Sequence, residues 1–89
     1  MLPMNYAILK LFENGDEYDA EMVMAKLAGE YAKFRAFKKA NVIESLMSAE
    51  KNEILEQSRY ELDDADELHI YYKATEYGAG LIKQYIKAK

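Results

Sequence analysis

The sequence predicts an α+β domain in which three helices precede a β-hairpin and a fourth helix follows it. Apolar side chains recur at helical spacing through the first half of the chain and again at its end. Between these regions, residues 54–74 alternate between apolar and polar side chains, as strands with one exposed face do. Gly15 and Gly29 break the helical pattern where short helices would turn. The length of 89 residues fits one domain spanning residues 1–89.

The first helix is expected at about 3–13. Pro3 suits its first turn, where the missing N–H removes no hydrogen bond, and Gly15 follows its expected end. Its inward-facing residues are expected to be Met4, Ala7, Ile8, Leu11 and Phe12. This apolar stripe is broad, so the helix should be central and covered by its neighbours.

Two more helices are expected at about 19–28 and 33–49. Asp19 can cap the first of them by accepting a backbone N–H, and Gly29 should end it. The inward stripe of helix 33–49 is expected to be Ala36, Ala40, Ile43, Leu46 and Met47. Two short helices around a glycine-containing turn, with a third helix before them, form a helix-turn-helix layout.

Strands 54–62 and 68–74, joined by the loop 63–67, should form the hairpin. One register gathers the apolar side chains on a single face, whereas a slip of one residue would mix the two faces. It pairs Leu62 with Leu68, Tyr60 with Ile70 and Ser58 with Tyr72. On the opposite face it pairs Glu61 with His69, Arg59 with Tyr71 and Gln57 with Lys73.

The last helix is expected at about 76–87, with Thr75 as its N-cap. Gly78 would allow this helix to approach the sheet closely, because glycine has no Cβ. The inward stripe is expected to be Leu81, Ile82, Tyr85 and Ile86.

Two segments resemble known bacterial proteins. Residues 72–82, YKATEYGAGLI, look like the strand-to-helix junction of winged helix-turn-helix regulators of the MarR and PadR types. Residues 5–10, NYAILK, are similar to the first helix of small YjcQ-like winged-helix proteins. The resemblance implies a winged helix-turn-helix fold, a bacterial DNA-binding regulator, a recognition role for helix 33–49, and a last helix used to form a homodimer. A monomer with half-buried tyrosines at the sheet edge is the alternative.

Positive charge gathers around one helix of a chain whose net charge is −4. Residues 26–43 hold five basic residues against Glu30 alone. Such clusters can hold DNA phosphates, while asparagine, lysine and serine can contact base edges. The residues predicted to contact double-stranded DNA are Lys33, Arg35, Lys38, Lys39, Asn41, Ser45, Ser48 and Arg59. The alternative is an ordinary solvated helix face.

The hairpin loop argues against this interpretation. Its acids, Asp63, Asp64, Asp66 and Glu67, would be repelled by phosphates. A basic protein partner at these four residues is therefore the second hypothesis, in which the chain is a protein-interaction module that does not bind DNA. Arg59, lower on the hairpin, could instead stack on Tyr71.

Other functional classes find little support. The chain has no cysteine and one histidine, so a zinc site of Cys and His ligands cannot form, and we expect no metal and no cofactor. No serine has a histidine placed by a motif to activate it, and no glycine-rich phosphate loop occurs, so an enzyme is not expected. No apolar run is long enough to span a membrane, which points to the cytoplasm.

Overall fold

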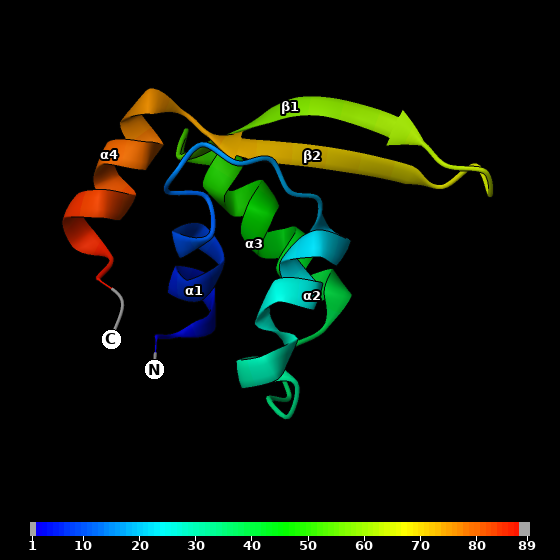
Figure 1. Cartoon of the computed structure of the whole chain (residues 1–89), viewed down its shortest axis with the longest axis horizontal. Coiled ribbons are helices and arrows are strands. Elements are labelled where there is room, and N and C mark those ends of the chain that lie inside the picture. Colours follow the sequence, from blue (N-terminus) through cyan, green and yellow to red (C-terminus); the bar gives the residue numbers. More distant parts are fainter. Residues whose placement is uncertain (1, 88–89) are drawn as a thin grey trace.

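The computed structural model describes residues 2–87. In chain order its elements are α1 (Met4–Lys10), α2 (Ala20–Tyr31), α3 (Lys39–Lys51), β1 (Leu55–Leu62), β2 (Leu68–Ala74) and α4 (Glu76–Tyr85). This order confirms the predicted α+β class. In Figure 1 the antiparallel hairpin lies across one end of the three-helix group, and its tip extends beyond the helices. Helix α4 lies at the other end of the hairpin, on the side of α1.

Several predicted helix boundaries are wrong. Helix α2 continues past Gly29 to Tyr31, whose side chain is buried and whose hydroxyl donates a hydrogen bond to the Leu2 carbonyl. The next helix begins at Lys39 rather than at residue 33, because residues 32–38 form consecutive turns with a half-buried Phe37. At the chain ends, α1 stops at residue 10 and α4 at residue 85, each earlier than predicted.

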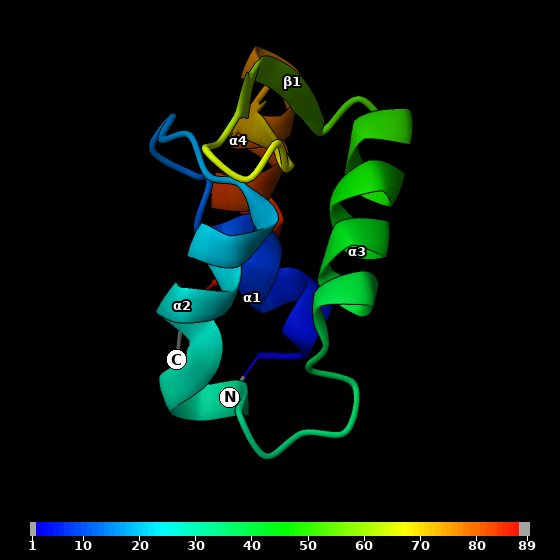
Figure 2. The ribbon, with the colours of Figure 1, turned by 90° about the vertical axis from the view of Figure 1, so that its right-hand side faces the viewer.

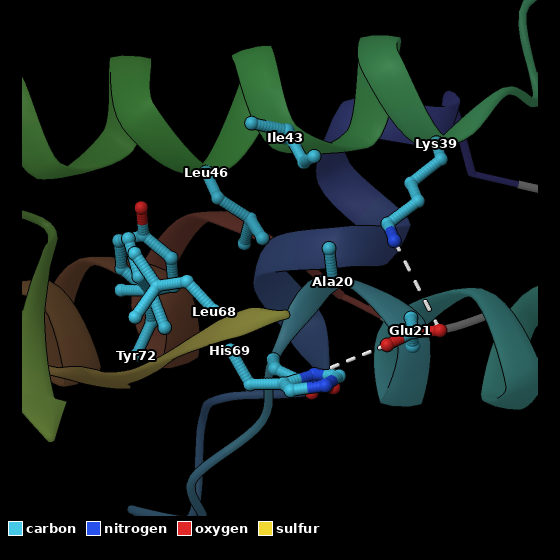
Figure 3. A pocket seen from close by; sticks show the side chains of 10 residues that line it. Ala20, Glu21, Lys39, Ile43, Leu46, Leu68, His69 and Tyr72 are labelled. Atoms are coloured by element: carbon cyan, nitrogen blue, oxygen red, sulfur yellow. Dashed lines mark hydrogen bonds and ion pairs between the residues drawn. The ribbon is translucent and has the colours of Figure 1, made fainter. Parts of the chain in front are cut away.

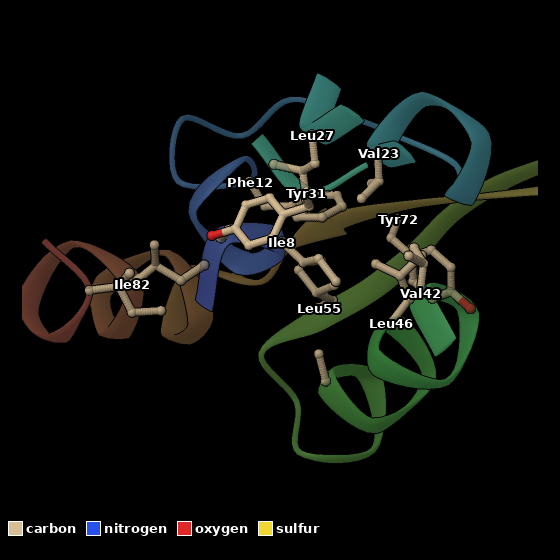
Figure 4. Packing of buried hydrophobic residues seen from close by; sticks show 13 residues of the cluster. Ile8, Phe12, Val23, Leu27, Tyr31, Val42, Leu46, Leu55, Tyr72 and Ile82 are labelled. Atoms are coloured by element: carbon tan, nitrogen blue, oxygen red, sulfur yellow. The ribbon is translucent and has the colours of Figure 1, made fainter. Parts of the chain in front are cut away.

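The core takes side chains from every element. Tyr31, Phe12, Ile8 and Leu46 are among the largest fully buried residues. Figure 4 shows side chains from the helices and the hairpin converging on this cluster. The segment before α2 also joins the hairpin, because Tyr18 and Tyr72 exchange two backbone hydrogen bonds of 3.0 and 2.9 Å. This bridge fixes the start of α2 against β2.

The predicted inward stripe of α3 is wrong in phase, and of its members only Leu46 is buried. The buried residues are Val42, Leu46 and Ala49, which also follow helical spacing. Ile43 and Met47, predicted to face inward, are 37% and 55% exposed. The helix is therefore rotated, and a different set of side chains faces solvent.

The hairpin register is correct near the tip and shifts below it. Leu62 pairs with Leu68, and the pairs formed by residues 59–61 are as predicted. A β-bulge at residue 58 then moves Gln57 opposite Tyr72 and Glu56 opposite Lys73, so the predicted pairs of Ser58 and Gln57 are wrong. The bulge has a physical reason. Leu55 and Leu62 are separated by an odd number of positions, so in a regular strand they would point to opposite faces. One extra residue lets both lie on the same face. Leu55 is thereby buried in the core.

Both predicted N-caps are present. The Asp19 carboxylate accepts the Met22 N–H at 2.8 Å, and the Thr75 hydroxyl accepts the Gly78 N–H at 2.8 Å. At Gly78 the backbone of α4 lies against Ile54, and an added Cβ would stand 1.9 Å from the Ile54 carbonyl oxygen. Among residues 2–87, no helix has the length and apolar character needed to cross a membrane.

Candidate nucleic-acid interface

The outer face of α3 is exposed to solvent. Figure 2 shows α3 along one edge of the molecule, with its outer side free of other elements. Opposite its buried stripe it exposes Ala40, Glu44, Met47 and Lys51, with Ile43 beside them. Sequence reasoning missed this face because the stripe used to orient the helix was out of phase. The signal that could have found it is the Val42, Leu46 and Ala49 spacing.

Four cations gather at the N-terminal end of α3, and we call them the basic cluster: Lys33, Arg35, Lys38 and Lys39. Lys33 and Arg35 lie in the turn before the helix, and Lys38 is its N-cap residue. Within the described part of the chain, no ion pair is formed by Lys33, Arg35 or Lys38. Lys39 Nζ is 3.9 Å from Glu21 Oε2, and both side chains are about half exposed, so this contact is weak. The cluster therefore carries largely uncompensated positive charge at the positive end of the helix dipole.

The three polar residues of α3 that were predicted to contact DNA have different surroundings. Asn41 Nδ2 donates to the Ala36 carbonyl oxygen at 2.9 Å and so supports the turn before α3. Ser45 Oγ donates to Asn5 Oδ1 at 2.6 Å and faces α1. Ser48 is exposed beside a groove between α3 and α1. Asn41 and Ser45 are thus both hydrogen-bonded within the fold, Asn41 through its amide nitrogen and Ser45 through its hydroxyl.

Arg59 is held on the hairpin, away from the basic cluster. Its Nε lies 3.0 Å from Glu17 Oε1, its guanidinium also pairs with Glu61, and its Cζ lies 3.8 Å from the centre of the Tyr71 ring. The pKa of Arg59 is raised, mainly because its guanidinium donates a hydrogen bond to Glu17. The predicted stacking on Tyr71 is therefore present. A DNA contact by this residue would require these partners to be given up.

The acidic loop at the hairpin tip has an internal order. Asp63 Oδ1 accepts the N–H groups of Ala65 and Glu67 at 2.8 and 2.9 Å, which closes the turn. Asp66 has a φ of 61°, in the left-handed region that aspartate tolerates better than most residues. Asp64, Asp66 and Glu67 are exposed and give the tip its negative charge.

His69 joins the hairpin to the start of α2 through three carboxylates. Its Nδ1 lies 3.0 Å from Asp19 Oδ2 and 3.1 Å from Glu21 Oε1, and its Nε2 lies 2.9 Å from Asp63 Oδ2. The hydrogen bonds to Asp63 and then Asp19 raise the pKa of His69. Figure 3 shows His69 directed toward Glu21, at the polar end of a groove that Ile43 and Leu68 line at the apolar end. Glu61 is its cross-strand partner, as predicted, but the ring bonds elsewhere.

Comparisons with known proteins identify the fold. No protein-family model and no curated protein matches the sequence. Among solved structures, the chain is similar to PadR of Bacillus subtilis in complex with operator DNA, with a TM-score of 0.75, 18% identity and 97% of this chain covered. It is also similar to a mutant of ZitR from Lactococcus lactis, with a TM-score of 0.67, 19% identity and 96% of this chain covered.

A third similar structure is a PadR-like transcriptional regulator from Bacillus cereus, with a TM-score of 0.68, 16% identity, 91% of this chain covered and 75% of that chain covered. The chain spans about half the length of PadR and of ZitR, 48% and 50% respectively. These similarities show that the chain has the winged helix-turn-helix fold, in which the β1–β2 hairpin is the wing.

Proposed function

We propose that this chain is a DNA-binding domain in which α3 enters the major groove and the basic cluster contacts phosphates. The observation that carries the proposal is the basic cluster itself, exposed at the N-terminal end of an outward-facing helix. Support comes from the fold, because the similar PadR is bound to operator DNA in its structure. Lysine and arginine at the start of a recognition helix fix its position on the duplex.

The outer face of α3 supplies groups that can read base edges. Glu44 can accept a hydrogen bond from cytosine N4, and the apolar side chains of Ile43 and Met47 can contact thymine methyl groups. Asn41 and Ser48 lie at the margins of this face, where the Ser48 hydroxyl and the Asn41 Oδ1 can contact bases, since the Asn41 Nδ2 is bound to the Ala36 oxygen. We assign no base contact to Ser45, whose hydroxyl is directed at Asn5 of α1, or to Arg59, which is held on the hairpin by Glu17.

We further propose a homodimeric transcriptional regulator of the bacterial cytoplasm. Tyr77 and Tyr85 on α4 are 61% and 69% exposed, and Tyr6 on α1 is 51% exposed, so the prediction that Tyr85 faces inward is wrong. Pairing through these tyrosines would remove exposed aromatic surface from water. Such a dimer would place two copies of α3 on half-sites about 34–36 Å apart.

Salt dependence of binding to duplex DNA tests the proposal. Four phosphate contacts give a log–log slope of about −3.6, so affinity should fall about 150-fold between 50 and 200 mM salt. Lys38→Glu combined with Lys39→Glu should abolish binding at low salt. Glutamate is favourable in the first turn of a helix, so this variant should remain folded.

The matched control is Lys83→Glu combined with Lys87→Glu, which changes the net charge equally at the far end of the chain. Fluorescence anisotropy with a labelled duplex of random sequence measures all three proteins. Absence of binding by the natural chain at 50 mM salt would overturn the proposal. Equal binding by the two double variants would overturn the role of the basic cluster.

A second candidate function is docking of a basic protein at the wing. Tyr60, Leu62 and Leu68 are 72%, 66% and 57% exposed beside the acidic loop, and an apolar surface edged by acids suits a basic amphipathic helix. A pull-down with a lysine-rich amphipathic peptide tests this candidate. Capture should be lost in a triple variant that keeps Asp63, and so the closed turn, but carries Asp64→Asn, Asp66→Asn and Glu67→Gln. Undiminished capture by this variant would remove the candidate, and stronger DNA binding by it would show that the wing lies near the duplex.

A further inference from the structure

We propose that His69 Nδ1, with the carboxylates of Asp19 and Glu21, binds one divalent cation of the zinc class. Two ligands lie at the start of α2, Asp19 as its N-cap and Glu21 in its first turn, and His69 lies on strand β2. This site is independent of the proposed function and departs from the expectation of no metal. Sequence reasoning considered only cysteine and a second histidine as partners for His69, whereas the fold supplies carboxylates fifty residues away.

The spacing of the ligand atoms suits such an ion. One atom from each of the three residues lies within 4.8 Å of the other two. In the tetrahedral geometry usual for zinc, bonds of about 2.0–2.2 Å to nitrogen and oxygen place neighbouring ligand atoms about 3.3–3.6 Å apart. Nδ1 is already 3.0 Å from Asp19 Oδ2 and 3.1 Å from Glu21 Oε1. Each carboxylate oxygen must therefore move about 0.2–0.6 Å farther from Nδ1 to admit an ion between them.

Two ligands are held in position by other contacts. The Asp19 residue is 5% exposed, and its Oδ1 accepts the Met22 N–H, which leaves Oδ2 directed at His69. The other ring nitrogen, Nε2, lies 2.9 Å from Asp63 Oδ2. Metal-binding histidines commonly donate their second N–H to a carboxylate, which fixes the tautomer and the ring orientation. Asp63 is therefore a positioning residue, itself anchored by two backbone N–H groups of the loop.

The donor set and the charge indicate the class of ion. One imidazole and two carboxylates favour Zn²⁺, Co²⁺ or Mn²⁺ over Mg²⁺ and Ca²⁺, which prefer oxygen ligands alone. Asp19, Glu21 and Asp63 surround one imidazole, and Lys39 is the nearby cation, 3.9 Å from the second oxygen of Glu21. A divalent ion would offset this excess of negative charge. It would also tie the wing to the start of the helix-turn-helix through direct bonds.

Titration with metal ions tests the site. The full chain is first treated with a chelator to remove bound metal, and the chelator is then removed. Calorimetry should show one Zn²⁺ per chain, and Co²⁺ should give visible absorption bands of a nitrogen- and oxygen-bound ion. Zn²⁺ at a hundredfold excess over its Kd should raise Tm by about 10 °C or more. Mg²⁺ should produce none of these changes.

Variants separate the site from nonspecific surface binding. Zn²⁺ binding should weaken at least about tenfold in Glu21→Gln and in His69→Gln. Glu21 is exposed, so its replacement should leave the fold intact. Binding should weaken about 10- to 100-fold in Asp63→Asn. The control is Asp64→Asn combined with Glu67→Gln, which should bind as the natural chain does. No Zn²⁺ binding by the natural chain, or equal affinity in Glu21→Gln and the control, would overturn the proposal.

Discussion

Replacement of Gly78 by alanine should strongly destabilise this chain, although alanine is the better helix former. The new Cβ would lie 1.9 Å from the Ile54 carbonyl oxygen and 2.8 Å from its Cα, both of them backbone atoms. Relief requires α4 and the start of β1 to separate. That movement would break the Thr75 N–H bond to the Ile54 oxygen at 3.0 Å and the Thr75 hydroxyl bond to the Glu53 oxygen at 2.6 Å.

The expected magnitude follows from these contacts. Two lost hydrogen bonds cost about 2 kcal/mol, and forcing atoms into a packed contact costs about 1–3 kcal/mol. The gain in helix propensity returns about 1 kcal/mol. The net loss in the free energy of unfolding is about 2–4 kcal/mol, which for a domain of this size lowers Tm by about 8–30 °C.

Gly80→Ala is the matched control, two residues further along the same helix. Nothing lies within 4 Å of the Cβ that it would add, so it should gain about 0.5–1 kcal/mol from helix propensity. Thermal melting followed by circular dichroism measures both variants against the natural chain. A Gly78→Ala protein that melts within about 3 °C of the natural chain would refute the close approach of α4 to Ile54.

Further predictions concern α3, α2 and the wing. Leu46→Ala should lower the free energy of unfolding by about 2–5 kcal/mol, whereas Met47→Ala, at a 55% exposed position, should change it by less than about 1 kcal/mol. Urea denaturation measures both variants. A larger loss in Met47→Ala than in Leu46→Ala would contradict the observed phase of α3. Asp19→Ala removes the cap on the Met22 N–H and should cost about 1–2 kcal/mol in the same assay, while Asp19→Asn should retain most of that stability. In metal-free protein the pKa of His69 is raised by its carboxylate contacts. These contacts therefore stabilise the fold fully below the pKa of the unfolded chain, about 6.5. Their contribution is lost as pH rises through the higher pKa of the folded chain. Melting in the presence of a chelator from pH 5.5 to 8.5 should show this loss in the natural chain, and an identical profile in His69→Gln would contradict it.

Local chemistry determined the features that the sequence predicted correctly. The N-caps at Asp19 and Thr75 act on backbone groups within three residues, so their residue types and positions identify them directly. The register near the wing tip follows from alternation beside a short loop, as in the pair Leu62 and Leu68. The concentration of basic residues before α3 is likewise a property of consecutive sequence. These features required no knowledge of distant contacts.

Tertiary structure decided the features that depend on which surfaces meet. Two stripes on α3 satisfy helical spacing and share Leu46, and burial against the other elements selected Val42 and Ala49 over Ile43 and Met47. The bulge at Ser58 arises because Leu55 must reach the core while the wing tip keeps its own register. The carboxylates around His69 converge from segments up to fifty residues apart, and no local periodicity records that proximity. Burial and convergence are properties of the packed chain, because they depend on neighbours that only the completed fold provides.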